Sequence, residues 1–245
     1  MTVATIVQAR MGSTRLPGKV LMDVAGAPLL AHVVERCDAM TRSDATIVAT
    51  STLAGDDPIE ALGAARGWRV FRGSEDDVLD RYVQAAREAG AEHVIRVTAD
   101  CPLVDPGEGD RVIAHHLATG ADYTHNITVW GGETPIGVGV EAFALGALEA
   151  SWRDGREPHH REHVDEYVYE HPERFRLERV PASAPLARPD LRLTVDTPED
   201  MALTRALYER LYVPGEIVSL AAAIALLDTS AELVALNAHV RQKTI

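Results

Sequence analysis

Short runs of β-branched residues alternate with segments of helical period through the first hundred residues, and no other feature of the sequence constrains the fold as strongly. The strand-like runs lie at 3–9, 45–51, 68–71 and 92–98, and the helical segments lie at 28–40, 57–67 and 75–90. Strands separated by helices of this length form βαβ units, which predict a mostly parallel sheet. Ligands of such sheets bind beyond the carboxyl ends of the strands, so the loops that follow strands are the expected site.

After about residue 105 the pattern is looser. We expect helices at 106–119, 142–153, 160–170 and from Pro198, two more within 215–241, and strands at 122–126, 174–180 and 191–195. No linker rich in Pro, Gly or Ser interrupts the chain. We therefore expect residues 1–245 to form a single α/β domain, with 214–245 as a helical tail that could provide a homodimer contact.

The composition argues against several classes of protein. The chain carries 24 Lys and Arg against 37 Asp and Glu, a formal net charge of −13, and an acidic surface repels nucleic acid. Cys37 and Cys101 form no CxxC pair, and no stretch approaches the roughly 20 apolar residues of a membrane span. The short apolar run before Arg10 lacks the pattern of a signal peptide. We expect a cytoplasmic protein without a nucleic-acid or membrane partner.

Positive charge gathers in the loop after the first strand, QARMGSTRLPGKVL at 8–21. Residues 1–22 contain three cations and no acid: Arg10, Arg15 and Lys19. Gly12, Ser13 and Thr14 are compact enough for backbone N–H groups to approach phosphate oxygens. The spacing of the glycines and the valine after the lysine exclude a Walker motif. The loop predicts a phosphate site; the alternative is an ordinary surface loop with a Pro-Gly turn.

This loop and further blocks in the same order resemble the cytidylyltransferases that activate 3-deoxy-octulosonate and sialic-acid-type sugars. The resemblance is stronger still to the spore-coat-polysaccharide type. The blocks that carry it are 8–21, 49–86, 94–106, 161–175, 191–200 and 235–245. The resemblance implies the nucleotide-diphospho-sugar transferase fold, a GT-A-like and Rossmann-like three-layer α/β sandwich with a mostly parallel mixed sheet. It also implies that segment 128–190 is an insertion that shapes an acceptor site and a dimer contact.

The resemblance assigns roles to residues of this chain. The loop residues implied to bind the phosphates of CTP are Ala9, Arg10, Gly12, Ser13, Arg15 and Lys19, and Arg72, Gly73 and Ser74 match the region that meets base and ribose. Catalytic roles are implied for Arg10, Arg15, Lys19 and Asp100, the last also in nucleotide binding. Glu141, Arg161 and His163 are expected to bind the acceptor. Two positions depart from the family pattern: Ala99 replaces a glycine and Gly139 replaces an acid.

Two aspartates follow predicted strands. Asp100 comes after the run 92–98 and Asp196 after 191–195. Mg²⁺ is bound in proteins through one or two carboxylates together with substrate phosphates, so this pair can serve as its ligands, and the resemblance favours that role. A second interpretation of Asp196 is a helix N-terminus with Thr197 as N-cap, and Asp100 alone could be a turn residue.

Two further patterns resemble binding motifs but are better explained without a ligand. His159, His160 and His163 lie near one face of a predicted helix and suggest zinc, but the segment is not HExxH and no cysteine is close, so a solvated helix is favoured. Residues 137–142 match a dinucleotide fingerprint by letter, but no clear strand precedes them, and we reject that motif.

The sequence therefore predicts an Mg²⁺-dependent cytidylyltransferase. It would move CMP from CTP to a small anionic acceptor, which is a sugar acid, a sugar phosphate or a phosphonate, and release pyrophosphate. One alternative is a glycosyltransferase of the same broad fold that uses a nucleotide sugar. Another is a nucleotide-binding module without catalytic activity.

Overall fold

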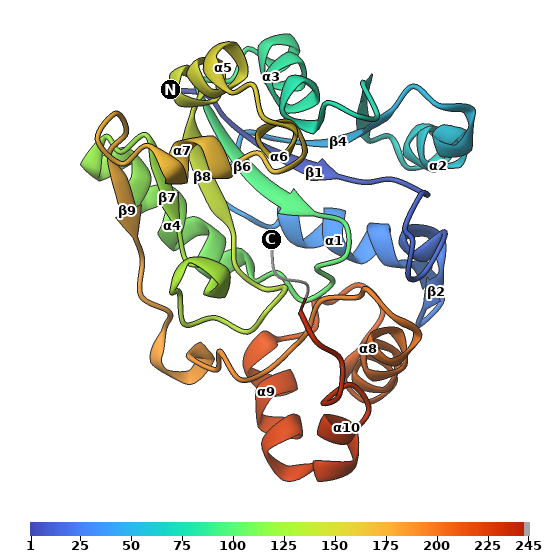
Figure 1. Ribbon diagram of the computed structural model, residues 1–245. Coiled ribbons are helices and arrows are strands. Elements are labelled where there is room, and N and C mark those ends of the chain that lie inside the picture. The colour runs from blue at the N-terminus through green and yellow to red at the C-terminus, as the bar shows by residue number, and fades with distance from the viewer. Residues whose placement is uncertain (243–245) are drawn as a thin grey trace.

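A seven-stranded mixed sheet forms the centre of the computed structural model, which describes residues 1–242. Its order is β5-β4-β1-β6-β8-β7-β9 (Figure 1). The strands are β1 (Val3–Gln8), β4 (Ala45–Ser51), β5 (Arg69–Gly73), β6 (His93–Thr98), β7 (Tyr123–His125), β8 (Glu141–Ala144) and β9 (Leu177–Arg179). Strands β5, β4, β1 and β6 are parallel, as the βαβ pattern predicts, whereas β8 runs antiparallel between β6 and β7. A two-stranded ribbon, β2 (Asp23–Val24) and β3 (Ala27–Pro28), lies outside this sheet.

Helices cover both faces of the sheet and make a three-layer α/β sandwich (Figure 1). The longer helices are α1 (Leu29–Asp38), α2 (Asp57–Arg66), α3 (Val78–Ala89), α4 (Pro106–Thr119) and α5 (Leu145–Asp154). Apolar residues of α1, α2 and α4 pack on one face of β1, β4 and β6, and those of α3 and α5 pack on the other. Because both faces of the central strands are buried, apolar residues occupy both faces of these strands and do not simply alternate with polar ones.

The remaining helices lie on the second half of the chain. They are the short helices α6 (Pro158–Glu162) and α7 (Glu166–Glu170), and then α8 (Pro198–Leu211), α9 (Leu220–Thr229) and α10 (Ala231–Ala235). The last three form a separate layer below the sheet (Figure 1), held by a third core cluster that also includes Val24, Leu29 and Leu103. Single turns of 3₁₀ helix lie at Lys19–Leu21, Ala54–Asp56, Thr128–Trp130 and Ala184–Leu186. Segment 128–190 contributes β8 and β9 to the main sheet.

Three predictions of secondary structure are wrong. Segment 191–195 is not a strand, because it pairs only through an isolated bridge between Ile136 and Arg192. Segment 160–170 is two short helices, because the backbone is extended at His163 (φ −108°, ψ 107°) and turns before the second helix begins at Glu166. The start of segment 142–153 belongs to β8, and only its later part is helical.

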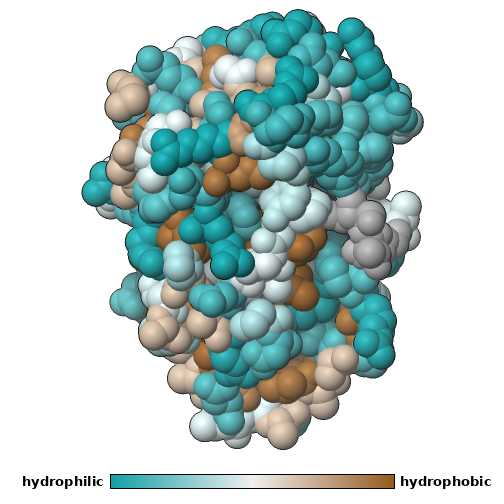
Figure 2. Space-filling view, turned by 60° about the vertical axis from the view of Figure 1, so that its left-hand side comes forward, coloured by the Kyte–Doolittle hydropathy of each residue, from teal (hydrophilic) through white to brown (hydrophobic). Residues whose placement is uncertain are grey.

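Polar residues dominate the surface in Figure 2, where apolar ones form small separate groups. The large apolar residues that are most exposed, Met1, Leu53, Val129 and Val213 among them, come from different parts of the chain. None of the helices within residues 1–242 has the length and apolar character that crossing a membrane requires.

Candidate active site

A polar pocket of about 260 Å³ opens at the carboxyl ends of β1 and β6. These strands are parallel neighbours, so the loops that follow them lie side by side, joined where the N–H of Ala99 donates to the carbonyl of Gln8 at 2.9 Å. The pocket is lined by Gln8, Arg10, Ser13, Thr14, Arg15, Lys19, Val20, Thr98, Ala99, Asp100, Glu162 and Asp196. The basic loop and both aspartates therefore face one space at the edge of the sheet where this fold class binds ligands.

Hydrogen bonds of its own backbone N–H groups position the basic loop. The N–H of Met11 donates to Asp56 at 2.7 Å, and the N–H of Gly18 donates to the carbonyl of Met11 at 3.0 Å. Gly18 has φ of +72°, a left-handed conformation that favours glycine. The backbone N–H groups of Gly12, Thr14 and Arg15 form no hydrogen bond with any other described residue. Unused N–H groups beside three cations suit the oxygens of a phosphate chain.

Lys19 lies between the two aspartates. Its Nζ donates to Oδ2 of Asp100 at 2.8 Å, to Oδ1 of Asp196 at 2.9 Å and to the carbonyl of Val195 at 2.7 Å. The lysine is buried at 8% exposure. Burial by itself would lower the pKa of Lys19, but the two carboxylates raise it above its usual value. The ammonium therefore stays charged and brings an oxygen of each carboxylate to one cation.

Asp100 is fixed by its own loop. Thr98 donates from its hydroxyl to Oδ1 of Asp100 at 2.6 Å, and the buried thiol of Cys101 lies 3.6 Å from the same oxygen. Burial favours the neutral form of Asp100, yet the Lys19 ammonium and these hydrogen bonds hold the pKa of this carboxyl below its usual value. Asp100 is thus a carboxylate at neutral pH.

Asp196 is placed by a different set of contacts. The N–H of Val195 donates to the carbonyl of Asp100 at 2.8 Å, which brings the segment before α8 alongside β6. Arg15 and Arg192 contact Oδ2 of Asp196 at 3.0 and 2.8 Å. At the start of α8, Thr197 and Asp200 form the capping box, so the predicted N-cap is confirmed.

Arg192 links Asp196 to the C-terminal helices. Its guanidinium contacts Asp200 at 3.0 Å, and the amide of Asn237 donates to Asp200 at 2.9 Å and to the carbonyl of Arg192 at 3.0 Å. Arg192 was not among the predicted site residues. The signal for it was weak, since the segment 191–195 is apolar at every other position as in a strand.

The residues expected to meet base and ribose lie outside the lining of this pocket. The guanidinium of Arg72 donates to the carbonyls of Ser51 and Leu53 at 2.8 and 2.9 Å and pairs with Asp57 and Glu60. Gly73 ends β5, and a Cβ there would lie 3.1 Å from Arg81. Ser74 accepts a hydrogen bond from the N–H of Asp77 at 3.1 Å. Their nucleotide-binding role stays a prediction.

The three residues expected to bind the acceptor also lie outside the pocket lining. Glu141 is buried and contacts Arg96 and the hydroxyl of Tyr123, the latter at 2.7 Å. Arg161 donates to Asp77 at 2.9 Å and to the carbonyl of Trp152 at 2.7 Å. His163 has extended backbone at the end of α6. Glu162, between the last two, does line the pocket and was not predicted.

The two departures from the family pattern have a local explanation. Ala99 does not adopt a positive φ, so the backbone before Asp100 needs no glycine, and Ala99 is among the residues that line the pocket. Gly139 is closely covered: a Cβ there would lie 2.8 Å from Ile127 and 2.9 Å from the side-chain oxygen of Asn126. An acid at position 139 would not fit this backbone.

Comparison with known proteins gives a consistent result. A family model described as cytidylyltransferase matches residues 4–223. The chain is 39% identical over 210 residues to the spore coat polysaccharide biosynthesis protein SpsF of Bacillus subtilis, covering 84% of this chain and 85% of that protein. It is 41% identical over 113 residues to a 3-deoxy-manno-octulosonate cytidylyltransferase of Anaeromyxobacter dehalogenans, covering 45% of this chain and 46% of that one. A cytidylyltransferase structure from Leptospira borgpetersenii matches with a TM-score of 0.88 at 29% identity, covering 100% of this chain and 99% of that chain.

Proposed function

The chain belongs to the cytidylyltransferase family, and from this premise we propose that it transfers CMP from CTP to a small anionic acceptor and releases pyrophosphate. One observation carries the proposal: a basic loop with unused backbone N–H groups and the carboxylates of Asp100 and Asp196 face the same pocket of about 260 Å³. The cations and N–H groups suit the negative charge of a triphosphate and of its leaving group, and the two carboxylates suit a divalent cation that neutralises the phosphates.

In the proposed reaction an oxygen of the acceptor attacks the α-phosphorus of CTP. The bond between the acceptor oxygen and phosphorus forms, and the bond between the α-phosphorus and the bridging oxygen to the β-phosphate breaks. Arg10, Arg15, Lys19 and the N–H groups of the loop bind the departing pyrophosphate. Fixed donors of this kind stabilise the transition state because they need no reorganisation when charge moves onto the leaving oxygen.

Asp100 and Asp196 fit an Mg²⁺ site. Both carboxylates already bring one oxygen to a common cation, the Lys19 ammonium, and hard oxygen donors are the ligands that Mg²⁺ prefers. When bound there, Mg²⁺ would supply charge neutralisation for the phosphates. In the nucleotide-free protein Lys19 holds the two carboxylates together, and with nucleotide bound it contributes its charge to the phosphates.

The acceptor class is supported by relatives and by the pocket. The octulosonate cytidylyltransferase among the relatives acts, by its name, on a sugar acid. A sugar acid, a sugar phosphate and a phosphonate all carry an anionic group, which the cations of the basic loop would attract. The name of this relative supports a sugar acid as the acceptor, and sugar phosphates and phosphonates are included in the experiment below.

Glu162 is the candidate base for an acceptor that attacks through a hydroxyl. It lines the pocket and forms no ion pair with any of residues 1–242, whereas Asp100 and Asp196 are both paired with Lys19. We expect Glu162→Gln to slow transfer to a hydroxyl acceptor by about 10²-fold or more, the usual contribution of a general base, with CTP binding unchanged. Pyrophosphate release at several pH values checks this, and an unchanged rate would exclude Glu162 as the base.

The activity is tested with the purified chain, Mg²⁺, each of the four nucleoside triphosphates and a panel of the three acceptor classes. Pyrophosphate should form only with CTP and one acceptor class, and Asp100→Asn should slow its release by about 10²-fold or more. Asp228→Asn, an exposed acid on α9 that pairs with Arg188, is the matched control and should leave the rate unchanged.

Three outcomes contradict the proposal in different ways. Pyrophosphate release with another nucleotide would overturn the cytidylyl assignment and leave the family and fold intact. Consumption of a nucleotide sugar without pyrophosphate would indicate a glycosyltransferase. Binding of CTP without turnover on any acceptor would indicate a nucleotide-binding module.

A further inference from the structure

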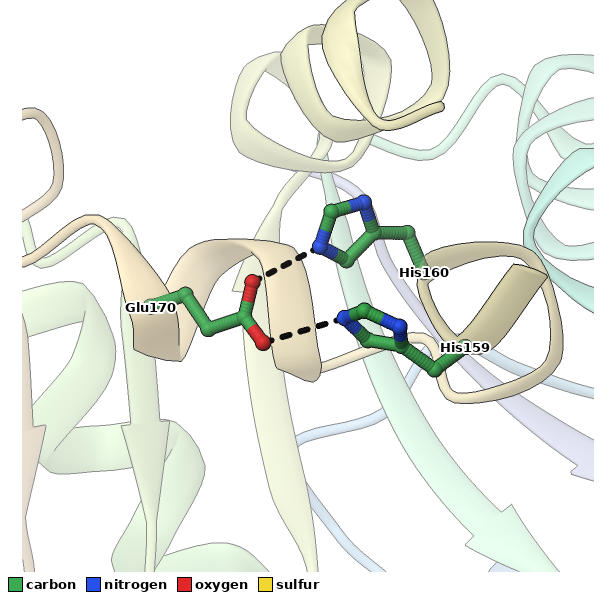
Figure 3. A group of neighbouring side chains, drawn as sticks. All are labelled: His159, His160 and Glu170. Atoms are coloured by element: carbon green, nitrogen blue, oxygen red, sulfur yellow. Dashed lines mark hydrogen bonds and ion pairs between the residues drawn. The ribbon is translucent and has the colours of Figure 1, made fainter. Parts of the chain in front are cut away.

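Two imidazoles and a carboxylate converge where α6 meets α7 (Figure 3). Nε2 of His159 lies 3.0 Å from Oε1 of Glu170, and Nε2 of His160 lies 2.7 Å from Oε2 of the same carboxylate. One ligand atom from each of the three residues lies within 4.8 Å of the others. The predicted solvated helix is therefore only partly right, because His160 is buried at 6% exposure whereas His159 is partly open to solvent.

A second carboxylate faces the same cluster. Oε2 of Glu166 lies 3.7 Å from Nε2 of His159, and Glu166 is buried at 4% exposure. Its other oxygen, Oε1, is buried without a hydrogen-bond partner among the described residues. A buried carboxylate oxygen that lacks a partner is costly, and a bound cation is one way in which proteins compensate such a group.

We propose that His159, His160 and Glu170 form a binding site for Zn²⁺ or a similar borderline divalent cation, with Glu166 or water as a further ligand. Two imidazole nitrogens distinguish this site from the all-oxygen pair at the pocket, because imidazole suits Zn²⁺ and carboxylates alone suit Mg²⁺. The site is independent of the proposed nucleotidyl transfer, and neither depends on the other.

The geometry requires only small movements. Tetrahedral Zn²⁺ with bonds of roughly 2.0–2.1 Å separates its ligand atoms by about 3.4 Å. Each imidazole nitrogen lies 2.7 or 3.0 Å from one oxygen of Glu170, and one ligand atom of each residue lies within 4.8 Å of the others. The His159 imidazole makes no hydrogen bond with residues 1–242 other than the one to Glu170, so its tautomer is free to change. His160 must give up the 3.3 Å bond that its Nδ1 accepts from the N–H of Glu157, since Nδ1 carries the proton when Nε2 binds metal.

A cation here would link two helices beside the pocket. His159 and His160 lie on α6, which also carries Glu162 of the pocket lining, and Glu170 lies at the end of α7. A metal bond between these helices would fix α6 more firmly than hydrogen bonds alone. The site would thus stabilise the wall of the pocket that Glu162 forms.

The test uses the full chain and ZnCl₂ in a calorimetric titration, with Co²⁺ as a spectroscopic substitute whose visible absorption reports nitrogen ligands in a tetrahedral site. We expect one equivalent bound. His159→Ala and Glu170→Gln should each weaken binding by at least about tenfold and abolish the Co²⁺ spectrum. Both side chains are partly exposed, at 42% and 48%, so these variants should fold as the unchanged protein does.

Two controls assign the binding to this cluster. His115→Ala removes the histidine of a surface His–Glu pair, 3.2 Å from Glu178, and should leave Zn²⁺ affinity unchanged. Asp100→Asn should retain the zinc equivalent, because it changes only the carboxylate pair in the pocket. The proposal is wrong if no zinc equivalent binds, if His159→Ala leaves the affinity unchanged, or if Asp100→Asn removes the equivalent.

Discussion

Lys19 illustrates how much one side chain decides at the residue scale. Its ammonium contacts both carboxylates of the pocket and stays charged because they compensate its burial. A buried charge that loses its partner is strongly destabilising, so the three groups depend on one another. The same contacts mean that Lys19 competes with any dication for Asp100 and Asp196.

Replacing Lys19 by methionine should separate its role as a cation for the leaving group from its role as a competitor of Mg²⁺ for the carboxylates. We expect Lys19→Met to slow CTP-dependent pyrophosphate release by about 10²-fold or more, because a cation is lost from the leaving group. Without its competitor, Mg²⁺ should bind more tightly to the nucleotide-free protein, which calorimetry measures. Slower turnover with unchanged Mg²⁺ affinity would show that Lys19 does not compete for the carboxylates.

Glu141 is a second residue whose surroundings set its behaviour. Burial raises its pKa to about 7, against the opposing effect of the Arg96 guanidinium. A raised pKa in the folded state means that the folded protein binds this proton more tightly than the unfolded chain does. Its contribution to stability is therefore fully present below about pH 4.5 and is lost as pH rises through about 7.

Glu141→Gln should remove this pH dependence. Between pH 5 and pH 8 the free energy of unfolding of the unchanged protein should fall relative to that of the variant by roughly 1–3 kcal/mol. Denaturant unfolding at both pH values measures the difference. The control is Glu209→Gln, an exposed glutamate of α8, which should show no such difference. A Glu141→Gln profile parallel to the unchanged one would contradict the shift.

At the scale of elements, α8 connects helix capping to the pocket. Thr197 accepts a hydrogen bond from the N–H of Asp200 at 3.3 Å, and Asp200 in turn accepts from the N–H of Asp196 at 3.0 Å. The start of the helix therefore fixes the backbone of a proposed metal ligand. Ser219 caps α9 in the same way, through the N–H of Ala222 at 3.3 Å. Neither of these two residues is among those that line the pocket.

These two caps offer a matched pair of variants. Thr197→Ala and Ser219→Ala should each lower the free energy of unfolding by about 1 kcal/mol, the usual loss for an N-cap. Only Thr197→Ala should raise the Mg²⁺ concentration needed for half-maximal activity, since only that cap orients Asp196. An equal effect of both variants on the Mg²⁺ dependence would mean that the cap acts through stability alone.

At the scale of the whole molecule, the pocket joins distant parts of the fold. The basic loop comes from the N-terminus, Asp100 from the middle of the sheet and Asp196 from the start of the C-terminal layer. A ligand that contacts all three should stabilise the folded state as a unit, because it binds only where they are assembled.

CTP with Mg²⁺ should therefore raise the melting temperature of the full chain. At a concentration of 100 times the dissociation constant the expected stabilisation is about 2.7 kcal/mol. UTP should give a smaller shift, and the Mg²⁺-dependent part should disappear in Asp100→Asn. Thermal unfolding with CTP alone, with CTP and Mg²⁺ and with UTP and Mg²⁺, in the unchanged chain and in Asp100→Asn, measures these shifts. A shift with Mg²⁺ that survives in Asp100→Asn would exclude this carboxylate as a ligand.

The parallel half of the sheet, the cap of α8 and the position of the basic loop could all be predicted from the amino-acid sequence. These depend on periodicity and on neighbours within a few residues, and both are visible in the chain as written. The family blocks added the fold, which the comparisons confirm. Segment 191–195 was misjudged because an apolar extended run looks the same whether or not a neighbouring strand pairs with it.

Which charged side chains contact one another depends on the folded arrangement of the chain. Lys19 contacts carboxylates 81 and 177 residues further along the chain, and Arg192 connects Asp196 to Asn237. His160 and Glu170 likewise approach because the chain leaves helical geometry at residues 163–165, between α6 and α7. Such contacts depend on how the layers pack and on which buried charge needs a partner. No local pattern encodes either, because both are properties of the folded core as a whole.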